Sequence, residues 1–336
     1  MDTGSTLGLA LVNLTSPPLL AFVLGLVAAG LRSDIRLPEA VYQATSMYLL
    51  LAIGIKGGVA LRDTEAADVV APIAVSVALG VVIPIAAFWL LRWWTRLSRI
   101  DRGAMAAHYG STSLVTFTAA LVFLEGAGIA FEGYVTTLLT VLEIPGIIVG
   151  LMLALGGSTA VRSGDPDRAE RPHWGETLRE VILGRSVLLL LGGLLLGWAT
   201  GPVGYARIEP FFGDIFTGVL TVFLLEMGLV AGQQWRALAK AGPGLVAVAL
   251  VFPVRAGTVG VAAGLVAGMG VGGAMALGTL CASASYIAAP AATRLALPNA
   301  NPGVTLLSSL GMTFPFNLIV GIPLYLAIAQ FLSRWI

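Results

Sequence analysis

The chain has 336 residues, of which 57% are hydrophobic and only 11% are charged, and its formal net charge is +1. A soluble domain carries about 25% charged residues, so a single globule of this length cannot bury the apolar excess and lipid must cover much of it. The near-neutral charge argues against a nucleic-acid partner, and the single cysteine excludes an internal disulfide bond.

A helix that crosses the hydrocarbon layer needs about 20 mainly apolar residues. Runs of this kind follow one another along the whole chain and predict an all-α polytopic membrane protein with ten transmembrane helices. The expected spans are residues 16–32, 41–61, 70–91, 103–124, 134–156, 183–201, 214–235, 243–268, 273–292 and 304–332.

The basic residues sort onto one side of these ten spans. Of the 19 lysines and arginines, three (Arg62, Arg207 and Arg334) lie on the opposite side, and two (Lys56 and Arg255) fall inside spans. Cytoplasmic loops are enriched in basic residues, so both termini are expected on the non-cytoplasmic side. The residues on the basic side are Arg32, Arg36, Arg92, Arg96, Arg99, Arg102, Arg162, Arg168, Arg171, Arg179, Arg185, Arg236, Lys240 and Arg294.

An internal repeat divides the chain into two halves. The tetrapeptide at residues 103–106, Gly-Ala-Met-Ala, returns at residues 273–276, a shift of 170 residues. The same shift aligns Gly-Ser-Thr-Ser at residues 110–113 with Leu-Cys-Ala-Ser at residues 280–283, and it aligns Pro145 with Pro315. A constant shift that registers glycine, proline and hydroxyl residues indicates a duplicated structural unit.

Each predicted half holds five spans, an odd number, so the second half enters the membrane upside down relative to the first. This is the inverted-repeat plan of many secondary transporters. The expected units are a first five-span repeat at residues 1–157, a polar cytoplasmic linker at 158–182, and an inverted five-span repeat at 183–336.

Glycine and hydroxyl residues gather inside the fourth and ninth predicted spans, where they favour interruption of the helix. Unwound backbone at this depth is tolerated only where it is buried in protein or lines a watery cavity. The exposed amides of a half-helix N-terminus suit an anion, and freed carbonyls and hydroxyls suit sodium. The alternative is that small hydroxyl residues only allow close helix packing. The candidate substrate-binding residues are Gly110, Ser111, Thr112, Ser113, Ser283, Ala284, Ser285 and Tyr286.

Four further residues are candidate ion ligands. Glu143 lies inside the fifth predicted span, where an ionised carboxylate is costly and therefore a functional candidate. Thr116, Thr313 and Asn317 add neutral oxygens at similar depths. The alternatives are that Glu143 lies near a span end or carries a proton, and that the others only hydrogen-bond neighbouring helices.

Lys56, Glu226 and Arg255 also fall inside predicted spans. Lys56 is expected to extend outward towards the interface. A structural ion pair of Glu226 with Lys56 or Arg255 is a possible arrangement in the spans outside the repeat core.

The chain resembles the sodium-dependent bicarbonate transporters of cyanobacteria and their relatives in other bacteria. The resemblance covers nearly the whole chain. It is clearest at Leu37-Pro38-Glu39-Ala40, at residues 54–62, in the fourth span with its Leu-Val-Phe-Leu-Glu end at 121–125, at residues 283–321 and at Pro323-Leu324.

The resemblance implies a core of spans three to five and eight to ten, a scaffold (gate) of spans one, two, six and seven, a homotrimer, and an elevator-like movement in a bacterial inner (plasma) membrane. It implies that bicarbonate and sodium bind at residues 110–113 and 283–286. Tyr286 stands where cyanobacterial members have an acidic residue, which either weakens the electrostatic case for one sodium ion or transfers that duty to Glu143, hydroxyls or carbonyls. The central loop is shorter than in those proteins, so a regulatory signalling protein is unsupported.

These observations predict a secondary active transporter that takes up bicarbonate or a similar small anion with sodium as the coupling ion. No cofactor is expected, and no nucleophile and base stand together, so the protein is not predicted to be an enzyme. Two alternatives stay open: a sodium symporter for another organic anion on the plan of the bile-acid symporters, and a non-transporting membrane receptor or partner-binding protein.

Overall fold

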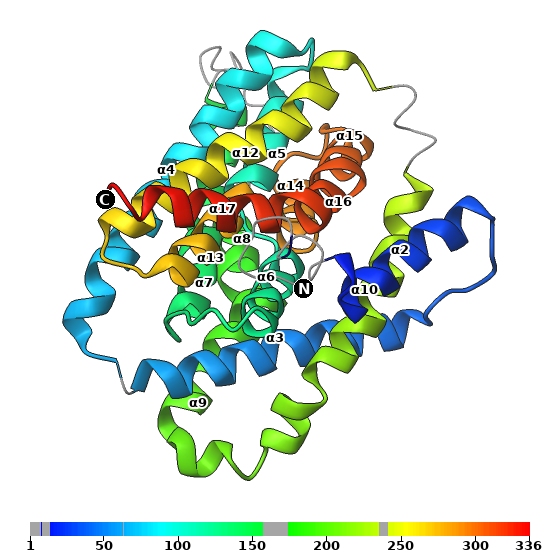
Figure 1. Ribbon diagram of the computed structural model, residues 1–336. Coiled ribbons are helices and arrows are strands. Elements are labelled where there is room, and N and C mark those ends of the chain that lie inside the picture. The colour runs from blue at the N-terminus through cyan, green and yellow to red at the C-terminus, as the bar shows by residue number, and fades with distance from the viewer. Residues whose placement is uncertain (1–7, 9–13, 63, 157–173, 235–240) are drawn as a thin grey trace.

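The structure of the protein is a computed structural model, and its described residues are helical with no strand among them (Figure 1). It describes residue 8 and residues 14–62, 64–156, 174–234 and 241–336. The helices before the central linker are α2 (Pro17–Gly30), α3 (Glu39–Arg62), α4 (Ala66–Trp94), α5 (Arg99–Gly110), α6 (Leu114–Gly126) and α7 (Val135–Leu155).

The second half of the chain begins with a helix that the sequence did not predict. This helix, α8 (Trp174–Leu183), occupies the described part of the expected polar linker, and its Val181 is buried. The elements that follow are α9 (Arg185–Tyr205), η2 (Pro210–Asp214), α10 (Phe216–Gln233), α12 (Pro243–Val266), α13 (Val271–Ala282), α14 (Ala288–Ala296), α15 (Pro302–Leu306), η3 (Leu307–Thr313), α16 (Phe314–Phe316), η4 (Asn317–Gly321) and α17 (Ile322–Leu332).

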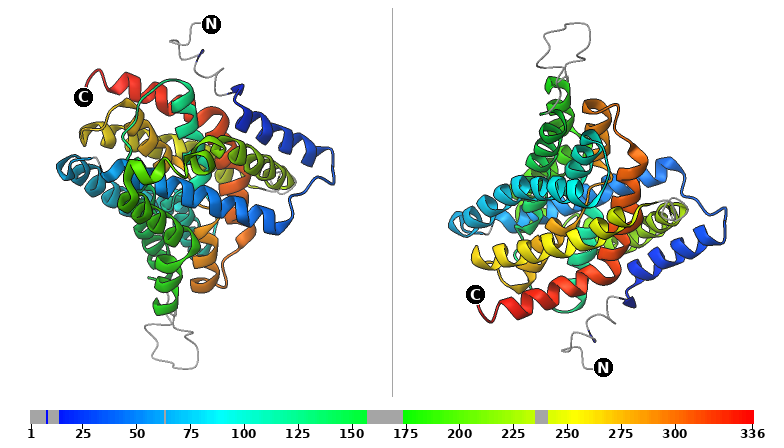
Figure 2. Two further views of the ribbon diagram at one scale, coloured as in Figure 1. Left: turned by 90° about the horizontal axis from the view of Figure 1, so that it is seen from below. Right: turned by 90° about the horizontal axis from the view of Figure 1, so that it is seen from above.

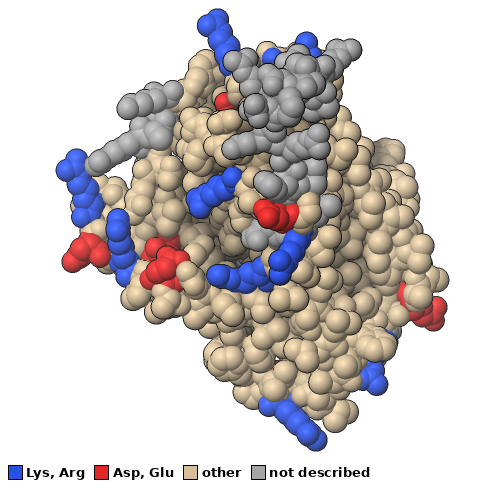
Figure 3. Space-filling view, turned by 180° about the vertical axis from the view of Figure 1, so that it is seen from behind, with Lys and Arg blue, Asp and Glu red and all other residues tan. Residues whose placement is uncertain are grey.

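Eight helical segments among the described residues are long and apolar enough to cross a membrane. They coincide with eight of the predicted spans, and the other two predicted spans coincide with the shorter apolar helices Pro17–Gly30 and Val271–Ala282. The chain is therefore an α-helical, multi-pass membrane protein. Most of the surface in Figure 3 is uncharged, as expected for a molecule that faces lipid.

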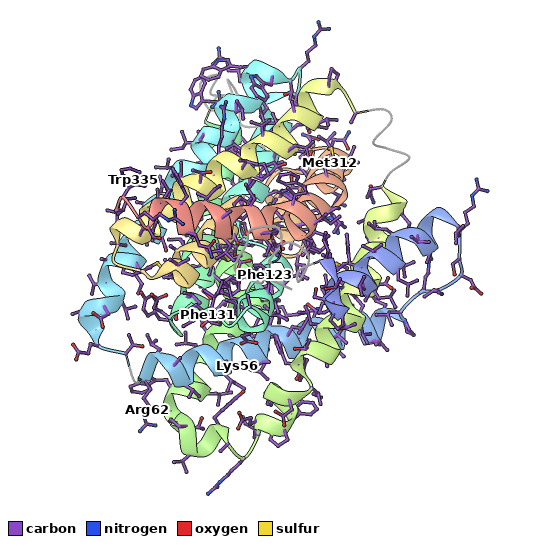
Figure 4. All side chains as sticks on the ribbon, in the orientation of Figure 1. Lys56, Arg62, Phe123, Phe131, Met312 and Trp335 are labelled. Atoms are coloured by element: carbon purple, nitrogen blue, oxygen red, sulfur yellow. The ribbon has the colours of Figure 1, made fainter. Side chains whose placement is uncertain are left out.

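The connections between helices lie at two opposite faces (Figure 1). The α2–α3 and α4–α5 connections lie towards the top and right of that view, together with the start of α12. The α3–α4, α9–η2 and α12–α13 connections lie towards the left and bottom. Arg62 and Trp335, labelled in Figure 4, lie at this second face. The arginine-rich connections before α3 and before α5 thus share one face.

Two parallel helix pairs form one part of the molecule: α3 packs along α9, and α2 packs along α10. We call these four the paired helices. The remaining membrane helices pack on one another, with α4 and α5 on α7, α13 and α17 on α12, and α4 on α12. Helix α2 lies at the outer flank in both views of Figure 2.

Glycines allow the paired helices to touch backbone to backbone. A Cβ atom added at Gly58 of α3 would lie 2.0 Å from the Leu194 carbonyl oxygen, and one at Gly197 of α9 would lie 2.0 Å from the Ile55 carbonyl oxygen. The α2–α10 pair uses the same device, because a Cβ at Gly25 would lie 2.2 Å from the Leu225 carbonyl oxygen. Small residues at such crossings are how membrane helices gain packing area without a hydrophobic driving force.

The charges inside the paired helices are arranged differently from the prediction. Glu226 of α10 accepts a hydrogen bond from the backbone N–H of Leu37, 3.0 Å away, in the connection before α3. The Lys56 ammonium (Figure 4) lies 4.7 Å from the centre of the Phe216 ring, a cation–π contact. The partner that the structure shows for Glu226 is therefore a backbone donor, and the partner of Lys56 is an aromatic ring.

Carboxylates tie the two halves of the chain together at helix starts. Glu132, in the connection before α7, accepts from the backbone N–H of Gly270, 2.6 Å away, at the N-cap of α13. Asp101, in the first turn of α5, accepts from the backbone N–H of Asn301, 2.8 Å away, at the N-cap of α15. A carboxylate beside a helix N-terminus is stabilising, so the first half contributes to two helix starts of the second half.

The glycine crossing makes a direct prediction. Gly197→Ala should lower the apparent Tm in detergent by roughly 5 °C, because overpacking costs about 1–3 kcal/mol. The matched control is Gly192→Ala on the same helix, where an added Cβ meets nothing within 4 Å. Thermal unfolding of both purified variants measures the difference, and equal Tm values would contradict the packing account.

Candidate functional site

The fourth predicted span is interrupted at residues 111–113. Helix α5 ends at Gly110, and Ser111 has extended backbone angles (φ −91°, ψ 161°). Ser113 is also extended and forms the N-cap of α6, its hydroxyl accepting from the backbone N–H of Thr116 at 3.3 Å and from the Thr116 hydroxyl at 3.0 Å. Serine is a strong N-cap residue, and such hydroxyls offer the backbone an alternative to the helical bond.

The ninth predicted span is interrupted in the same way. Helix α13 ends at Ala282, Ser283 is extended (φ −85°, ψ 165°), and α14 begins at Ala288. The Ser285 hydroxyl accepts from the backbone N–H of Ala289, 3.2 Å away. Pro290 lies in the first turn of α14, where a proline removes no intrahelical hydrogen bond.

The two interruptions meet each other. The backbone N–H of Ser113 donates to the Ser283 hydroxyl at 2.8 Å, and the backbone N–H of Ser285 donates to the His108 carbonyl at 2.8 Å. Ser113 and Ser283 are 170 residues apart, the spacing of the sequence repeat. The Asn317 side chain donates to the Ala282 carbonyl at 2.9 Å, which satisfies an acceptor freed at the end of α13.

A small cavity lies where the interruptions face α3 and α9. Its volume is about 10 Å³, which is room for about one water. Both interruptions, α7 and the paired helices contribute to its wall. The lining residues are Leu50, Thr112, Ser113, Leu114, Leu139, Glu143, Ser186, Leu190, Ser285, Tyr286, Ile287 and Ala288.

Glu143 provides the carboxylate of this cavity. Its side chain is 3% exposed, and its Oε2 atom has no hydrogen-bond partner among the described residues. A buried carboxylate without a partner is costly. Binding of a proton or a cation would remove this cost. Tyr286 contributes an aromatic wall, its ring packed edge-to-face on Phe314 with centroids 5.2 Å apart.

Some predicted site residues lie beside the cavity rather than on its wall. A Cβ at Gly110 would lie 2.8 Å from the Gly146 carbonyl oxygen, so Gly110 allows α5 and α7 to approach closely. Ser111, Thr116, Ser283 and Ala284 are buried within or next to the interruptions. None of these five is among the lining residues.

Thr313 and Asn317 also lie away from the cavity wall, where they join helices. The Thr313 hydroxyl donates to the Ala249 carbonyl at 2.8 Å and accepts from the Tyr109 hydroxyl at 2.8 Å. Besides its bond to Ala282, Asn317 accepts from the Tyr325 hydroxyl at 2.8 Å. These bonds correspond to the alternative in which the two side chains hold neighbouring helices together.

The sequence missed the wall that the paired helices supply. Leu50 of α3, and Ser186 and Leu190 of α9, line the cavity opposite the interruptions. The only sequence signal was a serine directly after the helix-start arginine Arg185. Which side of α9 faces the interruptions is decided by packing and not by residue type.

A larger cavity of about 540 Å³ adjoins the small one. The two cavities share the lining residues Ser186, Tyr286, Ile287 and Ala288. Its wall carries the charged residues Glu39, Arg185 and Arg294. Figure 3 shows a hollow on the rear of the molecule bordered by basic and acidic side chains. The small cavity is thus reached from a wide vestibule whose arginines belong to the basic side predicted from the sequence.

Two interrupted membrane helices that meet at a polar cavity define a class of transport protein, since unwound backbone at this depth belongs to a solute site. The comparison with protein families agrees. The model of the Na+-dependent bicarbonate transporter superfamily matches residues 17–330, and the chain belongs to this superfamily. The protein is thus a transporter-family member and not an enzyme. Comparison with curated proteins gives no match.

The contact between the interruptions predicts a specific loss of stability. The Ser283 hydroxyl accepts from Ser113 and donates to the Leu280 carbonyl at 2.7 Å. Ser283→Ala should lower the free energy of unfolding by about 1–3 kcal/mol, because a buried N–H loses its acceptor. Thermal unfolding in detergent measures the effect.

Thr279→Val is the control, because this buried hydroxyl one turn earlier donates to the Met275 carbonyl of its own helix. Its Tm should stay close to that of the wild type. A Tm loss in Thr279→Val as large as that in Ser283→Ala would show that the bond between the interruptions has no special weight.

Proposed function

We propose that the protein takes up bicarbonate, or a similar small anion, together with sodium by secondary active transport. The observation that carries this proposal is the meeting of two helix interruptions at one cavity that holds hydroxyls and an unpartnered carboxylate. Superfamily membership supports sodium and an inorganic anion as the transported pair.

The proposed architecture is a ten-span inverted repeat, with residues 1–157 and 183–336 as the two five-span units around the linker 158–182. The short helices α2 and α13 serve as the first span and as the first part of the ninth. Two observations support the repeat. The bonded pair Ser113 and Ser283 is equated by the sequence shift, and the α3–α9 pair has its counterpart in α10–α2.

In this proposal the anion binds between the N-terminal turns of α6 and α14. The first amides of a helix have no intrahelical acceptor, and the helix dipole favours a negative charge there. Thr112, Ser285 and Tyr286 line the cavity next to these turns and offer hydroxyl donors. Residues 110–113 and 283–286 thus form the substrate site, with Gly110 and Ser283 setting its backbone geometry.

Sodium takes the carboxylate side of the same cavity. Hard cations prefer oxygen ligands, and the unpartnered oxygen of Glu143 is the charged one available. Thr116 lies one hydrogen bond from Ser113 at the cavity wall. Thr313 and Asn317 hold the surrounding helices in place. Bound sodium would neutralise Glu143 and raise the affinity for the anion, and linkage requires the reverse effect to be equally large.

The remaining helices move as a core along the paired helices, which serve as the scaffold, because the cavity lies between these two sets. Under the predicted orientation, the vestibule with Arg185 and Arg294 opens to the cytoplasm. Placement in a bacterial inner membrane with both termini outside, and assembly as a homotrimer, complete the proposal.

Uptake into proteoliposomes tests the function. Labelled bicarbonate should enter faster with an inward sodium gradient than with choline, and a panel of carboxylates should not compete. Ser113→Ala and Ser283→Ala should lower the sodium-dependent rate per reconstituted protein on the order of tenfold, the equivalent of about 1.4 kcal/mol. Thr279→Val should transport like the wild type.

Two results would sink the assignment. Uptake at the wild-type rate by both serine variants would contradict the proposed substrate site. Uptake at the same rate with and without the sodium gradient would contradict sodium coupling. Competition by carboxylates would instead favour a symporter for organic anions.

Glu143 gives a separate prediction. Glu143→Gln should unfold at the same or a higher temperature than the wild type in sodium-free buffer, because a neutral amide is cheaper to bury than an unpaired carboxylate. It should lose the Tm increase that sodium chloride, compared with choline chloride, gives the wild type.

Glu132→Gln serves as the control, since Glu132 caps α13 away from the cavity. This variant should unfold at a slightly lower temperature and keep the sodium response. A wild-type sodium response in Glu143→Gln would exclude Glu143 as the ion ligand.

A further inference from the structure

Three arginines converge on two aromatic rings where α4 ends and α5 begins. The guanidinium carbons of Arg99 and Arg102 lie 5.5 Å and 5.1 Å from the centre of the Phe88 ring, and that of Arg92 lies 5.1 Å from the centre of the Trp89 ring. We call these three residues the arginine cluster. Stacking on aromatic rings fixes the planes of the guanidinium groups and lowers the entropy cost of binding a ligand.

Within the described part of the chain, the charged groups that act on Arg102 are the other two arginines of the cluster, and no carboxylate is one of them. Arg102 is within electrostatic range of Arg92 and Arg99, which carry the same charge, and its Nε–H is buried without a hydrogen-bond partner among the described residues. Asp101, its sequence neighbour, is already engaged by the Ser98 hydroxyl at 2.7 Å and by the backbone N–H of Asn301 at 2.8 Å. Like charges held together around an unused donor indicate an anionic ligand.

The position of the cluster indicates that this ligand comes from the lipid bilayer. Arg92 lies in the last turn of α4, a helix long and apolar enough to span the membrane. Trp89 and Trp93 on the same helix are 42% and 72% exposed. Tryptophan gathers at the level of the lipid headgroups, so the cluster lies at the boundary between hydrocarbon and water.

We infer that the arginine cluster binds the phosphate of an anionic phospholipid. Planar guanidinium groups bind phosphate in a bidentate manner, and basic pockets between membrane helices on the cytoplasmic side suit anionic headgroups. The enrichment of basic residues in cytoplasmic loops explains why arginines occur in this connection. It does not require two guanidinium groups on one buried ring, and Arg32 and Arg36, on the same face, make no such contact among the described residues.

One competing occupant lies within the chain. The Arg99 Nε–H donates to the Ala154 carbonyl, 3.3 Å away, at the end of α7, and the linker that follows contains Asp165, Asp167 and Glu170. Lipid is the favoured occupant because the exposed Trp89 and Trp93 place the cluster at the surface of the bilayer. The test must separate the two.

The experiment titrates the purified full-length protein with phosphatidylglycerol or with phosphatidylcholine of the same acyl chains, and reads lipid retention by native mass spectrometry. Wild-type protein should retain phosphatidylglycerol in preference to phosphatidylcholine. Arg99→Gln with Arg102→Gln should weaken retention on the order of thirtyfold, since each direct guanidinium–phosphate contact is charge-assisted and contributes a factor of at least about five. The matched control, Arg32→Gln with Arg36→Gln, removes the same charge from the same face and should change little.

Three results would overturn the inference. The first is equal loss of phosphatidylglycerol from the cluster and control variants, which would reduce the effect to net charge. The second is displacement of the lipid by millimolar inorganic phosphate. The third is a rise in retention of tenfold or more when Asp165→Asn, Asp167→Asn and Glu170→Gln are combined, which would assign the cluster to the linker.

Discussion

Backbone amides and carbonyls that leave a helix inside the hydrocarbon layer must find partners within the protein, since lipid offers none. Both interruptions in this chain meet the requirement by serving each other. Ser113 donates to Ser283, Ser285 donates to the His108 carbonyl, and Asn317 donates to the Ala282 carbonyl. This mutual satisfaction lets a polar cavity exist at the centre of an apolar molecule, and every proposed ligand contact depends on it.

The same requirement explains why the surrounding helices are rich in glycine. Interrupted helices are poor in internal hydrogen bonds, so their neighbours must hold them from outside. Gly110 and Gly146 bring α5 and α7 into backbone contact, while Gly260 and Gly264 bring α12 against α13. Close packing of this kind is rigid. The cavity is therefore bounded by well-fixed helices on one side and, on the other, by the paired helices, which contact it through Leu50, Ser186 and Leu190.

The sequence predicted those features that local chemistry decides. Apolar runs located the membrane helices, and clusters of glycine and hydroxyl residues located both interruptions, because these signals lie within a few residues. The partner of Glu226 could not be identified from the sequence, because the donor is the backbone N–H of Leu37 and every residue type but proline carries such a donor. Helix α8 was missed because its polar composition resembles a solvated loop, whereas its buried Val181 depends on contacts with distant residues. Ser186 escaped notice for the same reason.

The carboxylate ties between the halves bear on how the protein is made. Asp101 leaves the ribosome about 200 residues before its partner Asn301, and Glu132 precedes Gly270 by 138 residues. Through most of translation the first half must therefore stay in the bilayer while Asp101, Glu132 and the Ser113 amide lack the partners that the second half supplies. Completion of the chain and closure of the cavity between the interruptions are then one event, so a molecule truncated before α13 lacks this cavity.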